Sequence, residues 1–179
     1  MNSLRQATRV ILPPLDGKPI RVAVRRSLGP YHASTSIPRR TILLDGGVLA
    51  RRGEFERIVI HELFHFVWVR LSNATRRDWE AVLIGEFARG VRGELGWSSE
   101  WRKDTLALRT ARVRDARWRG AFVRDARWRR YACESFCDTA AWMFAGLGSH
   151  DEFTLPARAR SARRRWFQAL VSSAPRLHV

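Results

Sequence analysis

The chain has 179 residues, and 45% of them are hydrophobic, with eight Trp and nine Phe, which favours one folded domain over residues 1–179 and excludes wholesale disorder. Lys and Arg number 33 against 17 Asp and Glu, for a net charge of +16, and such a surface attracts phosphates, acidic proteins and anionic lipid. Arg interrupts almost every window of about 18 residues that a membrane-spanning helix would need, and the N-terminal stretch lacks the apolar run of a signal peptide, so we expect a cytoplasmic protein without membrane contact.

The first third of the chain favours β structure. Two short runs with β-branched residues, Ile20–Val24 and Thr41–Leu44, are bounded by Pro-Pro, Gly-Pro and Asp-Gly-Gly turn signals. Between them we expect a loop over Gly29–Arg40, which carries Tyr31 and His32. The sequence therefore predicts a small sheet near the N-terminus.

From Glu54 the pattern changes to helices. Residues Glu54–Leu71 contain no Gly or Pro and are apolar on nearly every side, which is typical of a buried helix. A second helix is predicted from about Asp78 to Gly90, followed by a Gly-rich loop that ends near Ser99. A third is predicted over about Tyr131–Ala145 and closed by Gly146 or Gly148. Strands followed by helices predict an α+β fold.

Arginine and tryptophan dominate an expected helical insertion around residues 100–130. The sequence VRDARWR occurs at 113–119 and again at 123–129. Two interpretations are open: the repeats grip an anion, or they form a solvated helix face on which Asp115 pairs with Arg119 and Asp125 with Arg129. A basic amphipathic helix over 156–172 follows, and we expect its arginines from Arg158 to Arg165 to join any anion-binding face.

The strongest motif is His61-Glu62-Leu63-Phe64-His65. Residues i and i+4 share one face of a helix, so His61 and His65 can present two imidazole nitrogens to one metal ion. Glu62 then lies beside the pair, where it serves as a general base towards the water that the metal activates. The spacing predicts a catalytic Zn²⁺ site.

A catalytic zinc ion takes three protein ligands, so a third ligand is expected on another element. Glu134 is the best candidate because it lies in the otherwise apolar sequence ACESFCDTAAWMF, where a carboxylate is costly unless it meets a cation. Asp138, four residues later, shares its face. One carboxylate can bind the metal while the other accepts the Nδ1 hydrogen of a histidine ligand.

HELFH followed by ESFCD resembles the gluzincin branch of the zincin metallopeptidases, in which HExxH precedes Glu-x-x-x-Asp on a later helix. The resemblance covers about 90 residues, from Thr41 to Phe144. It implies His61, His65 and Glu134 as zinc ligands, Glu62 as general base and Asp138 as the partner of a histidine ligand. It also implies a minimal zincin fold, in which strand Thr41–Leu44 is the edge along which an extended peptide lies.

The donor to the transition-state oxygen is left open by the sequence. Tyr131, three residues before Glu134 and on nearly the same face, is the first candidate, and His150 is the second. Tyr31 or His32 is a third choice, from the upstream loop. Gluzincins use a Tyr or a His in this role.

Two functions are therefore expected as alternatives. The first is zinc-dependent hydrolysis of a peptide or protein substrate. The second is a non-catalytic, basic zinc protein that binds nucleic acid, in which His61, His65, Cys133 and Cys137 form a closed structural site. In either case the Arg-rich surface suits an anionic partner, either a nucleic acid or an acidic protein.

Overall fold

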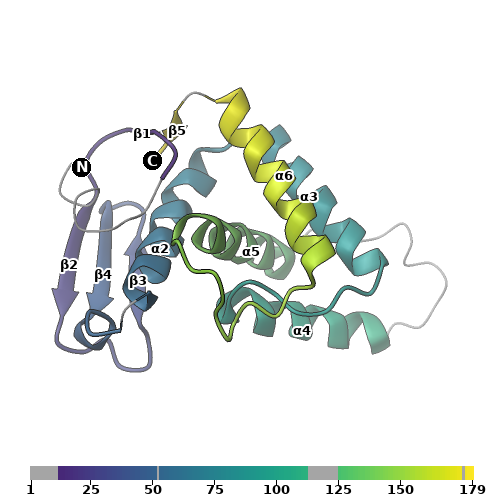
Figure 1. The fold of residues 1–179 in the computed structure, drawn as a ribbon, viewed down its shortest axis with the longest axis horizontal. Coiled ribbons are helices and arrows are strands. Elements are labelled where there is room, and N and C mark those ends of the chain that lie inside the picture. Colours follow the sequence, from purple (N-terminus) through teal and green to yellow (C-terminus); the bar gives the residue numbers. More distant parts are fainter. Residues whose placement is uncertain (1–11, 52, 113–124, 175) are drawn as a thin grey trace.

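The chain folds into an α+β structure with five α-helices and two small sheets over the residues described, 12–51, 53–112, 125–174 and 176–179. The computed structural model places a three-stranded sheet on one side of the helices (Figure 1). Both ends of this described part meet in a two-stranded parallel sheet of β1 (Leu15–Asp16) and β5 (Leu177–His178). In the ranges described, no helix is long and apolar enough to cross a membrane.

The three-stranded sheet has the order β2-β4-β3. Strand β2 (Arg21–Arg25) pairs in parallel with β4 (Thr41–Asp45), and β3 (Ala33–Ser36) pairs antiparallel with β4. Two expectations were wrong: the segment 29–40 is not wholly a loop, because it contains β3, and β4 is the central strand rather than an edge. The alternation of polar Ser and Thr in β3 carries no hydrophobic signal, which explains why the sequence did not reveal it.

Five helices follow the sheet in chain order. They are α2 (Glu54–Arg70), α3 (Asn73–Ala88), α4 (Trp97–Arg112), α5 (Ala126–Phe144) and α6 (Ala157–Ser173), and a short 3-10 turn, η1 (Gly46–Val48), precedes them. The predicted helices correspond to α2, α3, α5 and α6. The expected loop to Ser99 ends earlier, at Trp97, where α4 begins. The first VRDARWR copy lies outside the described residues, and the second is described only from Asp125, at the start of α5.

Local hydrogen bonds mark the N-terminal starts of α2 and α5. Glu56 accepts a hydrogen bond from the backbone N–H of Gly53 (3.1 Å), and Glu54 and Glu56 place negative charge at the positive end of α2. Asp125 caps α5 by accepting from the backbone N–H groups of Arg127 and Trp128. These caps set the register of the two helices that carry the expected site.

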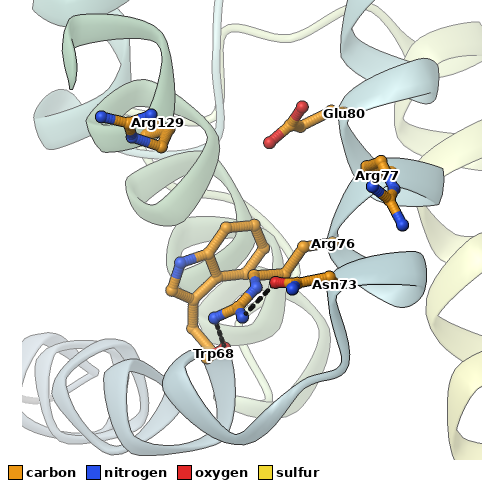
Figure 2. A pocket seen from close by; sticks show the side chains of 6 residues that line it. All are labelled: Trp68, Asn73, Arg76, Arg77, Glu80 and Arg129. Carbon is orange, nitrogen blue, oxygen red and sulfur yellow. Dashed lines mark hydrogen bonds between the residues drawn. The ribbon is translucent and has the colours of Figure 1, made fainter. Parts of the chain in front are cut away.

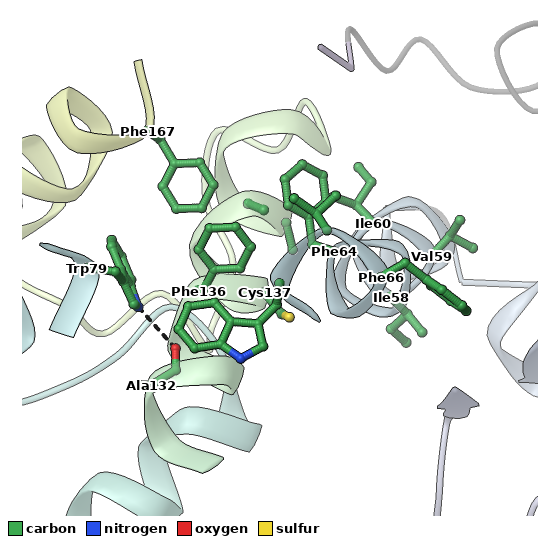
Figure 3. Packing of buried hydrophobic residues seen from close by; sticks show 14 of the residues in the cluster. Ile58, Val59, Ile60, Phe64, Phe66, Trp79, Ala132, Phe136, Cys137 and Phe167 are labelled. Atoms are coloured by element: carbon green, nitrogen blue, oxygen red, sulfur yellow. Dashed lines mark hydrogen bonds between the residues drawn. The ribbon is translucent and has the colours of Figure 1, made fainter. Parts of the chain in front are cut away.

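The core is an aromatic cluster between α2, α3, α5 and α6. Phe136 of α5 stacks on Phe167 of α6, with 4.8 Å between ring centroids, and also contacts Phe64 of α2. Trp79 of α3 completes the cluster, and its indole N–H donates to the backbone carbonyl of Ala132 (3.0 Å; Figure 3). The cluster packs α2, α3, α5 and α6 against one another.

A second, charged core lies beside the aromatic one. Arg163 of α6 is fully buried, and its guanidinium forms paired hydrogen bonds with both Glu86 of α3 and Glu94 of the α3–α4 loop, at 2.6–3.0 Å. Glu94 also contacts Lys103 of α4 (3.1 Å) and accepts a hydrogen bond from Tyr131 of α5 (2.6 Å). The expectation that the arginines from Arg158 to Arg165 share one anion-binding face is therefore wrong for Arg163, because Ala159, Arg163 and Phe167 form the inward stripe of α6.

The positive charges of this core stabilise the ionised form of Glu94. Burial by itself raises the pKa of Glu94, but the charges of Arg163 and Lys103 and the hydrogen bond from Tyr131 outweigh it and lower the pKa from 4.5 to about 2. A carboxyl group whose pKa is lowered on folding stabilises the fold above its unfolded pKa. The contribution of Glu94 is therefore complete above pH 4.5 and is lost as the pH falls towards 2.

Replacing Arg163 tests this core. Arg163→Met should lower the free energy of unfolding by about 3–5 kcal/mol, because Glu86 and Glu94 would keep their negative charges in a buried place without their main partner. Arg165→Met, on the exposed face of the same helix, should change it by no more than about 0.5 kcal/mol. Urea unfolding at pH 7 measures the free energy of unfolding of both variants. A loss below about 1 kcal/mol for Arg163→Met would contradict the view that Arg163 is the main partner of Glu86 and Glu94.

Candidate metal centre

Three metal-ligand groups from α2 and α5 meet at one point. His61 and His65, one turn apart on α2, place their Nε2 atoms 3.2 Å from each other. Glu134 of α5 places Oε2 3.3 Å from His61 Nε2. Two nitrogen or oxygen ligands at about 2.0–2.1 Å from a tetrahedral zinc ion are themselves about 3.3 Å apart. Both distances match this spacing, and the ligand atoms of the three residues all lie within 4.8 Å of one another, which is compact enough for one metal ion.

Asp138 orients the first of these rings. Its Oδ1 accepts from His61 Nδ1 at 2.7 Å, which leaves Nε2 to face His65 and Glu134. Its Oδ2 accepts from the Ser98 hydroxyl and from the Ser99 backbone N–H, both at 3.1 Å, at the start of α4. This is the arrangement in which a buried carboxylate fixes the tautomer of a histidine ligand.

The charges around His61 favour a cation at this point. Burial lowers the pKa of His61, but Asp138 and Glu134 accept hydrogen bonds from its two nitrogens and together raise the pKa well above 6.5. Burial raises the pKa of Glu134, whereas His61, His65 and Arg102 together lower it to about 2. Without a metal, the protonated ring of His61 thus supplies the positive charge that the two carboxylates require.

A pocket of about 350 Å³ opens beside this centre. His61 and Asp138 contribute to its wall, and so does Glu62 of the HELFH motif. The other side is formed by Tyr31, His32 and Ala33 from β3 and the turn before it, and by Trp97 and Ser98 at the start of α4. Tyr31 and Trp97 are about two-thirds exposed, so the opening has an aromatic rim. A ligand in this pocket meets Glu62 and His61 together.

Two expected site residues lie elsewhere. Tyr131 is fully buried and donates its hydroxyl hydrogen to Glu94, in the charged core. Burial and the charge of Glu94 raise the pKa of Tyr131 well above 10. His150 accepts the backbone N–H of Glu152 at Nδ1 (3.1 Å) and pairs through Nε2 with Glu54 at the start of α2. Neither ring lines the pocket beside His61, whereas Tyr31 and His32 do.

The two cysteines approach the other side of His65. Cys133 Sγ is 3.4 Å and Cys137 Sγ is 3.5 Å from His65 Nδ1. A hydrogen bond from Cys137 and the neighbouring His65 lower the pKa of Cys133 to about 6, although burial opposes this shift. The closed site of two His and two Cys that the sequence allowed is not assembled, because His61 turns its nitrogens to the carboxylates and only His65 faces the sulfur atoms.

A second pocket, of about 420 Å³, lies between the end of α2, α3 and the first turns of α5 (Figure 2). Trp68 forms its floor, and Arg76, Arg77 and Arg129 surround it together with Glu80. The guanidinium of Arg76 donates to the carbonyl of Trp68 and to Asn73. None of the residues expected at the metal centre lines this pocket.

Several residues that build the centre were not expected from the sequence. Gly96, Ser98 and Ser99 bring the start of α4 against Asp138, and Arg102 lies 3.3 Å from Glu134 Oε1. The sequence Gly-Trp-Ser-Ser-Glu carries a helix-start signal that could have identified the start of α4. No local signal links Arg102 to Glu134, because they meet only when α4 packs on α5.

Comparison of the chain with protein families, with curated proteins and with solved structures gave no match.

Gly96 provides a test of the Asp138 contact. A Cβ at this position would overlap the carboxylate of Asp138, so Gly96→Ala must displace either that carboxylate or the start of α4. We expect the free energy of unfolding to fall by about 1–3 kcal/mol, as in other overpacked sites. Gly148→Ala is the matched control, because a Cβ there meets nothing within 4 Å, and it should stay within about 0.5 kcal/mol of the wild type. Equal unfolding midpoints in urea would refute the contact.

Proposed function

We propose that the protein is a zinc-dependent peptidase, with His61, His65 and Glu134 as the zinc ligands and Glu62 as the general base. The observation that carries this proposal is the close approach of His61 Nε2 to His65 Nε2 (3.2 Å) and to Glu134 Oε2 (3.3 Å), beside a pocket that Glu62 lines. The donor set of two imidazoles and one carboxylate suits a catalytic zinc ion, which keeps one position open.

A bound zinc ion would act as a Lewis acid towards the substrate carbonyl and would make a water molecule more acidic. The chain's own groups would do the rest. Glu62 takes a proton from the attacking water and returns it to the leaving amine. Asp138 keeps the Nδ1 hydrogen of His61 in place, so that Nε2 keeps its lone pair for the metal. Arg102, 3.3 Å from Glu134 Oε1, leaves Oε2 as the ligand atom.

The same proposal assigns a place for an extended peptide. Strand β3 is an outer strand of the three-stranded sheet, and both β3 and β4 pack against α2 (Figure 1). Ala33 of β3 lines the pocket, and Thr35 donates to the backbone carbonyl of Glu62 (3.4 Å). A substrate that adds to the outer edge of β3 would pass the metal centre. In this proposal the arrangement is a minimal zincin fold of the gluzincin type, built from β3, the HExxH helix α2 and the Glu134-bearing helix α5. Strand β3 then takes the role that was expected of β4, the edge along which the peptide lies.

The pocket favours two of the candidates for the donor to the transition-state oxygen. Of the four side chains considered for this role, Tyr31 and His32 line the pocket, and Tyr131 and His150 do not. A hydroxyl or ring N–H from either residue can stabilise a developing oxyanion. The net charge of +16 would in addition steer anionic partners, such as acidic protein substrates, towards the molecule.

Zinc binding is the first test. Wild type should bind one zinc ion tightly. Loss of a residue that only hydrogen-bonds to a metal ligand weakens metal binding roughly 10- to 100-fold. Glu134→Gln and His65→Ala each change a ligand itself and should therefore weaken zinc binding by more than this. Asp138→Asn, which changes such a hydrogen-bonding residue, should fall in that roughly 10- to 100-fold range. Competition with a zinc-binding dye measures the affinities, with the exposed His178→Ala as control. A zinc affinity for Glu134→Gln within threefold of wild type would show that this centre does not hold the metal.

Glu62→Gln separates catalysis from metal binding. The amide keeps the shape of the side chain but cannot accept a proton from water, so the variant should keep zinc and fold while its rate of hydrolysis falls at least about 100-fold. The rate is measured with a library of fluorogenic peptides, and Asp78→Asn, on the exposed surface of α3, is the control. Cleavage by Glu62→Gln within tenfold of wild type would exclude Glu62 as the base, and a wild type that cleaves no peptide would contradict the peptidase proposal.

A further inference from the structure

His65 has a second set of metal-ligand neighbours that the proposed peptidase does not use. Its Nδ1 atom, with the sulfur atoms of Cys133 and Cys137, forms a group whose atoms all lie within 4.8 Å of one another. Cys137 is fully buried, at the boundary between α5 and α2, and Cys133 is partly buried (Figure 3 labels Cys137). The two cysteines come from consecutive turns of one helix, so the helix places both side chains on the same face before any ion arrives.

The distances within this group match metal coordination. A sulfur ligand at about 2.3 Å and a nitrogen ligand at about 2.0–2.1 Å from a tetrahedrally coordinated ion are about 3.5 Å apart. The observed distances from His65 Nδ1 are 3.4 Å to Cys133 Sγ and 3.5 Å to Cys137 Sγ. Both sulfur atoms thus already lie at the distance from the ring nitrogen that one bound cation would impose, and the two sulfur atoms lie within 4.8 Å of each other.

We propose that His65 Nδ1, Cys133 Sγ and Cys137 Sγ form a second metal site, which takes a soft, thiophilic cation of the Cu⁺ or Cd²⁺ class. Two thiolates and one imidazole are the donors that such cations prefer over the harder ions that bind carboxylates. Two negative sulfur atoms would also compensate the charge of the cation in this buried place. The site stands on these three residues alone and does not depend on peptide hydrolysis.

Sharing of His65 couples this site to the first one. A neutral imidazole has one ring nitrogen with a free lone pair and one that carries hydrogen. His65 can therefore bind a cation through Nε2, beside His61 and Glu134, or through Nδ1, beside the cysteines, but in its neutral form it cannot bind both. A thiophilic cation at the cysteines would remove a ligand from the other centre, and the two sites would compete for one side chain.

Cadmium titration tests the second site, because thiolates bound to Cd²⁺ produce a charge-transfer absorption in the ultraviolet. Wild type should develop this absorption up to one equivalent of Cd²⁺. Cys133→Ala and Cys137→Ala should each lose most of it and bind Cd²⁺ at least about tenfold more weakly. Glu134→Gln is the matched control: Glu134 belongs only to the other group of ligands, so this variant should keep both the absorption and an affinity within threefold of wild type.

Other results would overturn the second site. These are no charge-transfer absorption in wild type, an unchanged affinity in Cys133→Ala, or an equal loss in Glu134→Gln and Cys133→Ala. Because Cys137 is buried and its replacement can impair folding, circular dichroism checks each variant. X-ray absorption of Cd²⁺-loaded wild type gives an answer without any variant: two sulfur neighbours are expected, and fewer than two would refute the site. All of these readouts are independent of peptide cleavage.

Discussion

The burial of one positive charge, on Arg163, constrains the arrangement of the helices. A guanidinium in a protein interior is strongly unfavourable unless its hydrogen bonds and its charge are matched. Glu86 and Glu94 provide that match with paired hydrogen bonds, and Lys103 balances the second carboxylate. These residues come from α3, the loop after it, α4 and α6, so the charges can be neutralised only when all four segments are docked together. Tyr131 connects α5 to the same cluster.

The candidate metal centre depends on this cluster through a short series of contacts. Glu94 is held by Arg163, and two residues later Gly96 allows the chain to approach Asp138 closely. Ser98 and Ser99 then donate to one oxygen of Asp138, whose other oxygen orients His61. The position of the imidazole on α2 is therefore controlled from the N-terminal end of α4. At His65, in the described part of the chain, the sulfur atoms of Cys133 and Cys137 face Nδ1 in place of a carboxylate.

The helices could be predicted well from the sequence, and the sheet only in part. The apolar segments that begin at Glu54 and surround Phe136 have strong local patterns. The first forms α2 with both ends close to the expected positions. The second forms α5, which ends where expected but begins five residues before Tyr131. Strand β3 was missed because its residues, Ala-Ser-Thr-Ser, become a strand only by pairing with β4. The role of β4 as the central strand likewise depends on a pairing partner, which no local pattern reveals.

For the site, the sequence by itself determined which residues share a helix face: His61 with His65, and Glu134 with Asp138, because the i, i+4 spacing is a property of the helix alone. Only the tertiary structure decided which face meets which. Packing of α2 on α5 brings Glu134 to Nε2 of His61 and the two cysteines to Nδ1 of His65. Tyr131 lies in the charged core instead, where its hydroxyl donates a hydrogen bond to the buried carboxylate of Glu94. A buried polar group requires such a partner. Such choices depend on the relative positions of two helices, which are set by contacts between residues far apart in the chain.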